Sequence, residues 1–422
     1  MRIANQLTFA TYEASLKLNR NDPIKIIFDN IDWSFIHPLV SHKYSPQGAD
    51  GYDPISLFKA QPLIYLDEVK SDRKLASALR YDARLCLLCG FNLLKTPSNG
   101  TFSNFRDRLR DDTFYEILHR LIAQAIVLKI ILGRDTATDS THLCAYSNKF
   151  GKKTCSCKGK CGCPREYSDS DAQWGHKTKE YTFFGYKVHL IADAKSQLPL
   201  DVIVTPANES DSPYANPLLK GAKEKHPEIN LDSNSTDAAY DAYENYRFPI
   251  EDMGVAPIIV LNRRNGADAL TFGSLRISAE DTYTCLASFQ VVYWGKDPER
   301  GRFKFRCPAA LGKCQCLFRS TCSTSSYGKT FYLHPDRDYH LIGPIPSGTD
   351  LWQQKYNTRT SVERAYSEQK GSHHLANLRV RGLSRVRIHV YLALYAQVLK
   401  RTGGVITERL IKPHHAPCPV IA

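Results

Sequence analysis

The sequence predicts an α/β core that is preceded by an all-α domain and interrupted by a β-rich insertion. Helical periodicity dominates up to Ile131, and after Leu132 segments rich in β-branched residues alternate with helices. A second β-forming stretch, with several cysteines, separates the last core strand from a late helix. The predicted units are an all-α domain (1–131), the first part of the core (132–263, with a cysteine-rich loop at 150–180), the β-rich insertion (264–347), the second part of the core (348–411) and a disordered tail (412–422).

The chain is long and basic. Its 422 residues carry a formal net charge of +13, which indicates an acidic polymer, most often nucleic acid, as partner. A basic soluble enzyme of another kind is the alternative. The sequence has no apolar run of the ~20 residues that a membrane span requires, and its first residues lack a secretory apolar region. We therefore expect a cytoplasmic protein, in which 13 cysteines favour metal ligands or free thiols over disulfides.

Capping residues mark the helices of the N-terminal domain. Asp53 precedes a proline at the first position of one helix, and Ser71 precedes a second helix. Two more helices are predicted over 101–109 and 114–131. A DNA-binding helix-turn-helix with Arg106 facing phosphate is one interpretation of this segment. A helical cap packed on the core is the other.

Five strands define the core. They are predicted in GRDTATDSTHLCAY, YTFFGYKVHLIAD, LPLDVIVTP, a short segment that ends near Asp237, and APIIVLN. The short KSQ connection predicts antiparallel pairing of the second and third strands, and the apolar fifth strand is expected at the centre of the sheet. Three strands, a helix, a strand, a helix, a strand and a late helix follow one another in the ribonuclease H-like fold.

Three acidic residues occupy positions that this fold could bring together. Asp139 lies within the first strand, Asp237 at the carboxyl end of the fourth, and Glu363 on the late helix. The first and fourth strands are neighbours in this fold. Carboxylates so close repel one another unless cations neutralise them, and two Mg²⁺ or Mn²⁺ ions suit oxygen ligands. A cap or turn role is the alternative for Asp139, and Asp241 and Glu368 are the alternatives for the other two positions.

The late helix presents one chemically mixed face. We expect residues 352–370 to form a single helix, since neither Gly nor Pro interrupts them. At ~100° per residue, side chains three, seven and fourteen positions apart lie on one side. That side carries Trp352, Tyr356, Arg359, Glu363 and Lys370. A solvated face with an ion pair between the arginine and the glutamate is the alternative to a functional site.

These residues resemble the motifs of bacterial insertion-sequence transposases of the DDE class. The spacing Y-x2-R-x3-E-x6-K on the late helix is similar to the signature of that family, and D-S-T-H around Asp139 resembles its first catalytic motif. The segment after the fourth strand resembles D-x-G-Y-D, with Ala239 in place of the glycine. The N-terminal domain also resembles that of the same transposases, at residues 52–54, 71–73, 90–91, 97–98 and 101–106.

The resemblance implies a DNA transposase that cuts at the ends of its own mobile element and joins the 3′-hydroxyls to target DNA. It implies that the three carboxylates bind two Mg²⁺ or Mn²⁺ ions and that DNA phosphates are held by Tyr356, Arg359 and Lys370. Double-stranded DNA is the implied partner, in a bacterial, nucleoid-associated setting, and the pairing of two ends favours a homodimer. A metal-dependent nuclease without strand transfer and a catalytically silent, transposase-derived DNA-binding protein are the alternatives.

The chain after the late helix is basic. Six Lys or Arg and no acidic residue lie between positions 371 and 401. We expect Arg379 and Arg381 to contact phosphate. A plain solvated surface is the alternative.

Two cysteine clusters predict metal sites. The first consists of Cys155, Cys157, Cys161 and Cys163, and the second, in the insertion, consists of Cys307, Cys314, Cys316 and Cys322. Zinc with four thiolate ligands is the preferred interpretation of each cluster. Reduced thiols, in the first case within a flexible Lys-rich loop, are the alternative.

Overall fold

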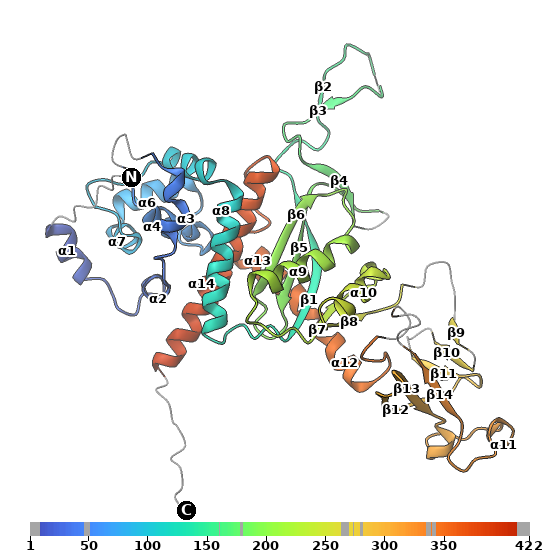
Figure 1. Cartoon of the computed structure of the whole chain (residues 1–422). Helices are drawn as coiled ribbons and strands as arrows, with labels where there is room; N and C mark the ends of the chain where they lie inside the picture. Colours follow the sequence, from blue (N-terminus) through green and yellow to red (C-terminus); the bar gives the residue numbers. More distant parts are fainter. Residues whose placement is uncertain are drawn as a thin grey trace, which may run out of the picture.

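The computed structural model describes residues 9–45, 51–159, 161–177, 180–262, 270–272, 274–278, 282–334, 339 and 343–411. A mixed sheet lies between a group of N-terminal helices and a pair of small sheets (Figure 1). The predicted tail at 412–422 lies outside the described residues. Within the described part, no helix combines the length and apolar character needed to cross a membrane.

The central sheet has the strand order expected of a ribonuclease H-like core. Its six strands are β1 (Asp135–Cys144), β4 (Gln173–His176), β5 (Thr182–Asp193), β6 (Pro199–Pro206), β7 (Ser233–Thr236) and β8 (Ala256–Ile259). β5 pairs antiparallel with β1, β4 and β6, whereas β1 pairs in parallel with β7, and β7 with β8. The hydroxyls of Thr136 and Thr138 donate to the amide oxygen of Asn234 at 3.1 and 3.0 Å. These bonds join the first core strand to the fourth.

The fifth core strand lies at an edge of the sheet, so its predicted central position is wrong. Among the described strands β8 pairs with β7 alone. All four residues of β8 are nevertheless buried, because α10 (Glu244–Glu251) and α12 (Asp350–Asn357) pack against it. Helices that cover the strand account for its apolar composition.

Eight α-helices precede the sheet in the described part of the chain. They are α1 (Phe9–Leu16), α2 (Pro23–Asn30), α3 (Ile36–Val40), α4 (Pro54–Ala60), α5 (Pro62–Tyr65), α6 (Asp72–Tyr81), α7 (Ala83–Cys89) and α8 (Asn99–Val127). Asp53 and Ser71 cap α4 and α6 as predicted. The helices predicted over 101–109 and 114–131 form the single element α8, which is broken at Arg110 by a non-helical φ of 61°.

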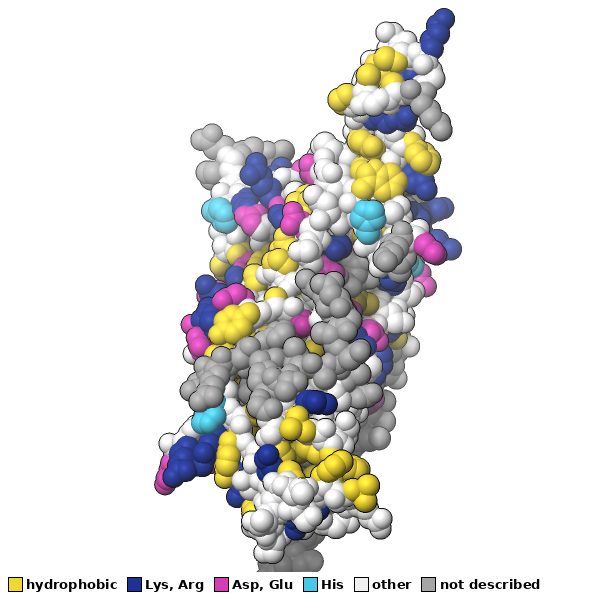
Figure 2. Space-filling view, turned by 90° about the vertical axis from the view of Figure 1, so that its right-hand side faces the viewer, with side chains coloured by type: hydrophobic (Ala, Val, Ile, Leu, Met, Phe, Trp, Pro, Cys, Tyr) yellow, Lys and Arg dark blue, Asp and Glu magenta, His cyan; other side chains and the backbone are white. Residues whose placement is uncertain are grey.

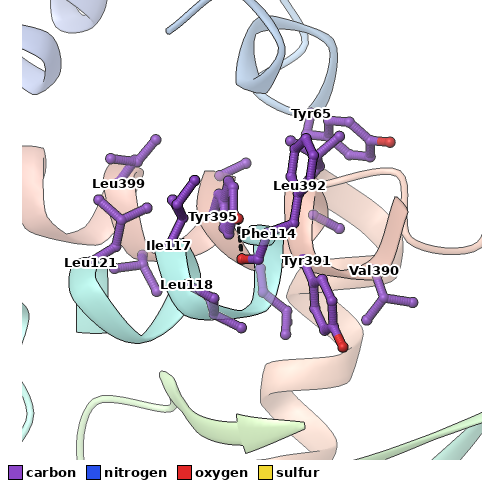
Figure 3. Packing of buried hydrophobic residues seen from close by; sticks show 14 of the residues in the cluster. Tyr65, Phe114, Ile117, Leu118, Leu121, Val390, Tyr391, Leu392, Tyr395 and Leu399 are labelled. Atoms are coloured by element: carbon purple, nitrogen blue, oxygen red, sulfur yellow. Dashed lines mark hydrogen bonds between the residues drawn. The ribbon is translucent and has the colours of Figure 1, made fainter. Parts of the chain in front are cut away.

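The C-terminal helix α14 (Leu383–Ile411) joins these helices to the sheet. It packs along α8 and also contacts α2, α5 and β6. Figure 3 shows the interface, to which α8 contributes Phe114, Ile117, Leu118 and Leu121 and α14 contributes Leu392, Tyr395 and Leu399. The Tyr395 hydroxyl donates to the carbonyl of Phe114. The buried core is therefore continuous from the N-terminal helices to the sheet.

The predicted β-rich insertion is present as two three-stranded sheets. Their strands are β9 (Leu270–Phe272), β10 (Leu275–Ile277), β11 (Tyr283–Cys285), β12 (Val292–Asp297), β13 (Arg302–Arg306) and β14 (Thr330–Leu333). They share a small core of their own, formed by Leu275, Ile277, Tyr283, Val291, Phe303, Phe305 and Phe331. Figure 1 shows this unit on the side of the sheet that is opposite the N-terminal helices.

A long excursion separates β1 from β4. It contains a hairpin of two short strands, β2 (Lys152–Lys153) and β3 (Arg165–Glu166), which projects away from the sheet in Figure 1. We call residues 145–168 the arm. Directly after the arm, buried Asp169 accepts hydrogen bonds from the Tyr186 hydroxyl at 2.7 Å and the backbone N–H of Gly382 at 3.2 Å. The base of the arm is therefore fixed to the sheet and to the start of α14.

Candidate active site

Asp139 lies in β1 on the face that meets α13 (Thr360–Ser372). Thr141 shares that face, because alternate residues of a strand point the same way, and its hydroxyl accepts a hydrogen bond from the Lys370 ammonium at 2.6 Å. The hydroxyl of Tyr366 lies 2.9 Å from the Asp139 carbonyl. α13 therefore crosses β1 directly over Asp139.

The surroundings of the Asp139 carboxylate disfavour its charged form. The carboxylate is partly buried and accepts a hydrogen bond from the Ser140 backbone N–H at 2.7 Å. The pKa of Asp139 is raised to about 7, mainly by burial and in part by the negative charges of Asp237 and Glu363, whereas the Ser140 N–H and the charge of Arg359 act in the opposite direction. The other two predicted carboxylates are thus electrostatic neighbours of Asp139.

Asp237 follows β7 directly, as predicted. Its side chain caps the short 3₁₀ helix Ala238–Tyr240 by accepting the backbone N–H of Ala239 at 2.8 Å. Ala239 is not among the described residues with positive φ, so an alanine fits without strain where the family has glycine. Because β1 and β7 are parallel neighbours, Asp237 emerges beside the strand that carries Asp139.

The late helix is broken, which corrects the prediction of one helix over 352–370. The structure has two helices, α12 and α13, which are separated at Thr358. The Thr358 hydroxyl donates to the Lys355 carbonyl at 2.6 Å, and the Ser235 hydroxyl on β7 donates to the same carbonyl at 2.9 Å. The Thr358 backbone N–H also donates to that carbonyl at 3.0 Å, and the N–H of Arg359 donates to the Tyr356 carbonyl instead, so the regular helical hydrogen bonding is interrupted there.

The predicted stripe survives on both sides of this break. The Arg359 guanidinium forms an ion pair with Glu363 at 2.6 Å and lies 5.8 Å from the Tyr356 ring. The Tyr356 ring stacks on Trp352 with centroids 5.0 Å apart. Trp352 itself is buried against β8. Trp352 therefore anchors the stripe in the core, and the ion pair expected of a solvated face is also present.

Comparison with known protein families identifies the family of the chain. Residues 132–399 match the family described as Transposase DDE domain, and this match covers more than half of the chain. The chain belongs to the DDE transposase family. Residues 12–108 match a second family, described as Transposase domain (DUF772). The two matches confirm the resemblance to insertion-sequence transposases, and the structure confirms the predicted fold class. No curated protein matches this transposase.

The carboxylates suit the divalent metal ions that this transposase family uses. They offer hard oxygen ligands, and the pKa of Asp139 is raised first by burial and, to a smaller extent, by the charges of Asp237 and Glu363, so that a bound cation would stabilise its charged form. In the described part of the chain, the carboxylate oxygens of these three residues do not all lie within 4.8 Å of one another. Two ions about 3.5–4 Å apart can bridge a wider set of ligands than one ion can.

Two other polar residues of the transposase adjoin the site and are not among the predicted site residues. Tyr240 is fully buried, and beyond the effect of burial its pKa is raised by the charges of Asp139, Asp211 and Asp237. Its place three residues after Asp237 was the available sequence signal. Asp211 precedes the 3₁₀ helix Ser212–Tyr214 without a side-chain cap hydrogen bond, and it forms an ion pair with Lys187 at 2.9 Å.

Asp241, the alternative to Asp237 as a metal ligand, has structural partners. It does not cap the next helix, since the residue at the N-cap of α10 is Tyr243. The Asp241 carboxylate instead accepts hydrogen bonds from the backbone N–H of Asn262 at 2.6 Å and from the Tyr246 hydroxyl at 2.8 Å. It ties the end of β8 to α10.

The basic residues predicted to bind DNA lie in different environments. Arg106 is mostly enclosed, and its guanidinium pairs with Asp72 and donates to the Gln61 side chain at 3.1 Å. These contacts favour a structural role over the predicted phosphate contact. Arg379 and Arg381 are exposed, although each donates one hydrogen bond to a backbone carbonyl. Their contacts with DNA remain predictions.

The two cysteine clusters differ in how closely their sulfur atoms approach one another. The sulfurs of Cys155, Cys157, Cys161 and Cys163 all lie within 4.8 Å of one another. The second cluster is not gathered in this way among the described residues. Burial is the largest cause of the raised pKa of Cys314, and the charges of Cys307, Cys316 and Cys285 follow. Cys322 does not contribute. The structure therefore does not support the four-cysteine site predicted in the insertion.

Proposed function

We propose that this transposase cuts DNA at the ends of its element and joins the freed 3′-hydroxyls to target DNA. Asp139, Asp237 and Glu363 are the proposed ligands of two Mg²⁺ or Mn²⁺ ions. One observation supports this most: the charges of Asp237 and Glu363, from β7 and α13, both act on the partly buried carboxylate of Asp139 in β1. A fold that gathers like charges in this way needs a cation to stabilise them.

The chemistry divides between the ions and the protein. When bound, a pair of divalent ions activates the attacking oxygen and stabilises the leaving oxygen of an in-line phosphoryl displacement. The protein orients the ligands: the parallel pairing of β1 with β7 sets Asp139 beside Asp237, and α13 brings Glu363 over them. Water is the nucleophile for cutting and the 3′-hydroxyl for joining, so no covalent bond between protein and DNA is needed.

Basic residues around the carboxylates are the proposed contacts to DNA phosphates. Lys370 projects from α13 onto the face of β1 that carries Asp139, and Arg359 lies between Glu363 and the Tyr356 ring. Each of these two basic side chains adjoins the proposed metal site, where the scissile phosphate would bind. A phosphate would compete with Glu363 for Arg359 and release that carboxylate to bind metal.

The proposal is tested on DNA ends taken from the sequence that flanks the gene, where inverted repeats mark the element. We expect Mg²⁺-dependent nicks at the repeat ends, and joining of pre-cleaved ends to a plasmid. Glu363→Gln should retain DNA binding and lose both reactions. Glu368→Gln, five positions along the same helix, is the matched control and should keep both. Cutting that survives Glu363→Gln and disappears in Glu368→Gln would move the third ligand to Glu368.

The joining reaction separates the proposal from its alternatives. A nuclease without strand transfer would nick the ends but leave pre-cleaved ends unjoined. A catalytically silent DNA-binding protein would bind the ends and do neither. Because two ends are joined in one event, we also propose that a homodimer holds them. Light scattering of the protein with end DNA should then show two chains and two DNA ends per complex, and one chain per end pair would contradict it.

A further inference from the structure

The arm lacks the apolar core that would hold its shape. None of its described residues, 145–159 and 161–168, is buried. Its hairpin has only two residues in each strand, pairing Lys152 with Glu166 and Lys153 with Arg165. An isolated hairpin of this length is marginal in water. A segment of this size without a core usually needs a disulfide or a structural metal.

The four cysteines lie at the point where that support is needed. They follow β2 and precede β3, so the hairpin delivers both pairs to one place. The sulfurs of Cys155 and Cys161 are 3.4 Å apart, and those of Cys157 and Cys163 are 3.8 Å apart. All four sulfurs lie within 4.8 Å of one another. Four sulfurs bound to one zinc ion at about 2.3 Å in a tetrahedron are about 3.8 Å apart.

A basic side chain at the cluster also favours thiolates. The Lys153 ammonium donates to the carbonyls of Cys157 and Gly159, which places a positive charge beside the cluster. A zinc ligand must be deprotonated before it binds. These contacts are already present in the hairpin.

We propose that Cys155, Cys157, Cys161 and Cys163 bind one structural Zn²⁺ ion, and that the zinc-bound arm contacts duplex DNA beside the active site. The DNA contact rests on the proposed function, whereas the zinc site does not. Zn²⁺ with four thiolates leaves two negative charges. Five Lys and one Arg in the arm outweigh these charges and the single Glu, so the arm remains basic.

The position of the arm supports the DNA contact. The arm leaves β1 only a few residues after Asp139, and Lys370 lies over Thr141 between that carboxylate and the arm. At the base of the arm, Arg381 donates to the Tyr146 carbonyl at 2.7 Å and stacks over the Tyr146 ring. Figure 2 shows Lys, Arg and hydrophobic side chains together on the projection at the top of the molecule. DNA bound at the carboxylates would extend along this basic face.

The zinc site is tested by metal analysis of the full chain purified without chelator. We expect about one zinc per chain, and cobalt substitution should give the intense absorption of tetrahedral Co²⁺ bound to thiolates. Cys155→Ser with Cys161→Ser should lose the metal. Cys314→Ser with Cys316→Ser is the matched control from the ungathered cluster and should retain it. Absence of zinc, two disulfides found by mass spectrometry, or metal unaffected by the first pair of substitutions would overturn the site.

The DNA contact is tested separately on variants that keep the zinc. Lys152→Gln with Lys158→Gln removes two exposed charges of the arm. We expect the zinc content to stay at about one per chain. The slope of log affinity for duplex DNA against log salt concentration should fall by about 1.8 in magnitude, about 0.9 for each lost phosphate contact. Lys220→Gln with Lys400→Gln removes two charges elsewhere and should change the slope less. Equal slopes in both double variants would overturn the DNA contact. Failure of cleavage alone, with zinc and slope as expected, would reject the proposed function and leave the arm proposal intact.

Discussion

The hydroxyl of Tyr366 lies 2.9 Å from the carbonyl oxygen of Asp139 and 2.8 Å from that of Val188. One buried side chain of α13 thereby lies within hydrogen-bond distance of both β1 and β5, at the residue that carries the Asp139 carboxylate. Glu363 lies one helical turn before Tyr366, on the same side of α13. The position of Glu363 relative to Asp139 therefore depends on a contact that does not belong to the catalytic carboxylates themselves.

Tyr366→Phe should lower both stability and the cleavage rate. The substitution removes a buried hydrogen bond between α13 and the sheet, at a cost of about 1–2 kcal/mol, and it loosens α13 over β1. DNA affinity should change little. Tyr395→Phe is the matched control, because the Tyr395 hydroxyl bonds the Phe114 carbonyl in the buried interface of α8 and α14. It should lower the urea midpoint similarly without slowing cleavage. An equal loss of cleavage in both variants would contradict a positioning role for Tyr366.

Glu368 should stabilise the fold above its unfolded pKa. The His373 imidazole, 3.7 Å from the carboxylate, together with Gln397 and Arg401, lowers the pKa of Glu368 to about 2. A carboxyl whose pKa is lowered on folding stabilises the folded state above its unfolded value of 4.5, and this contribution is lost as the pH falls towards 2. Glu368→Gln should therefore cost about 1–3 kcal/mol between pH 5 and 7. Urea titrations should show the difference from wild type shrinking below pH 4.5. A constant difference over this range would contradict the assigned cause.

Lys370 should contribute one phosphate contact. Its ammonium lies beside Thr141 on the face that carries Asp139. Lys370→Gln should therefore reduce the slope of log affinity against log salt by about 0.9, measured by fluorescence anisotropy on end DNA. Lys220→Gln, on the exposed surface of α9 (Ala215–Lys225), is the control and should leave the slope unchanged. The same slope in both variants would remove Lys370 from the DNA interface.

Arg106 should act on stability more than on DNA binding. Its guanidinium holds Asp72 at the start of α6 against α8. Arg106→Met and Asp72→Asn should each cost about 1–3 kcal/mol, and the double variant should cost much less than their sum, because the two residues are coupled. DNA affinity of the folded variants should stay within about twofold of wild type. A tenfold loss of affinity in Arg106→Met alone would restore the predicted phosphate contact.

The sequence was informative wherever local chemistry carries the signal. Asp53 and Ser71 cap their helices as predicted, since a cap depends on residues two or three positions away. Asp237 was placed correctly at the end of a strand for the same reason. The break at Thr358 was missed, because one of the two hydroxyls that produce it belongs to Ser235, 123 residues earlier in the chain.

The cysteine clusters also show that local sequence does not predict contacts between separate elements. Both have four cysteines within a short span, and spacing alone predicted a metal site in each. The first is gathered because a hairpin returns Cys161 to Cys155. In the second, Cys307 follows β13, whereas Cys322 is exposed at the end of the short helix α11 (Arg319–Cys322). No local pattern states where those two elements lie relative to each other.

The sequence by itself determined the family, the order of helices and strands, and the acidic residues that stand in its motifs, because periodicity and short-range capping are written in neighbouring residues. Only the tertiary structure decided that β8 forms an edge, that Arg106 pairs with Asp72, and that the charges of Asp237 and Glu363 reach Asp139. Those outcomes depend on contacts between residues far apart in the chain, whose free energies are set by burial and charge in the folded protein.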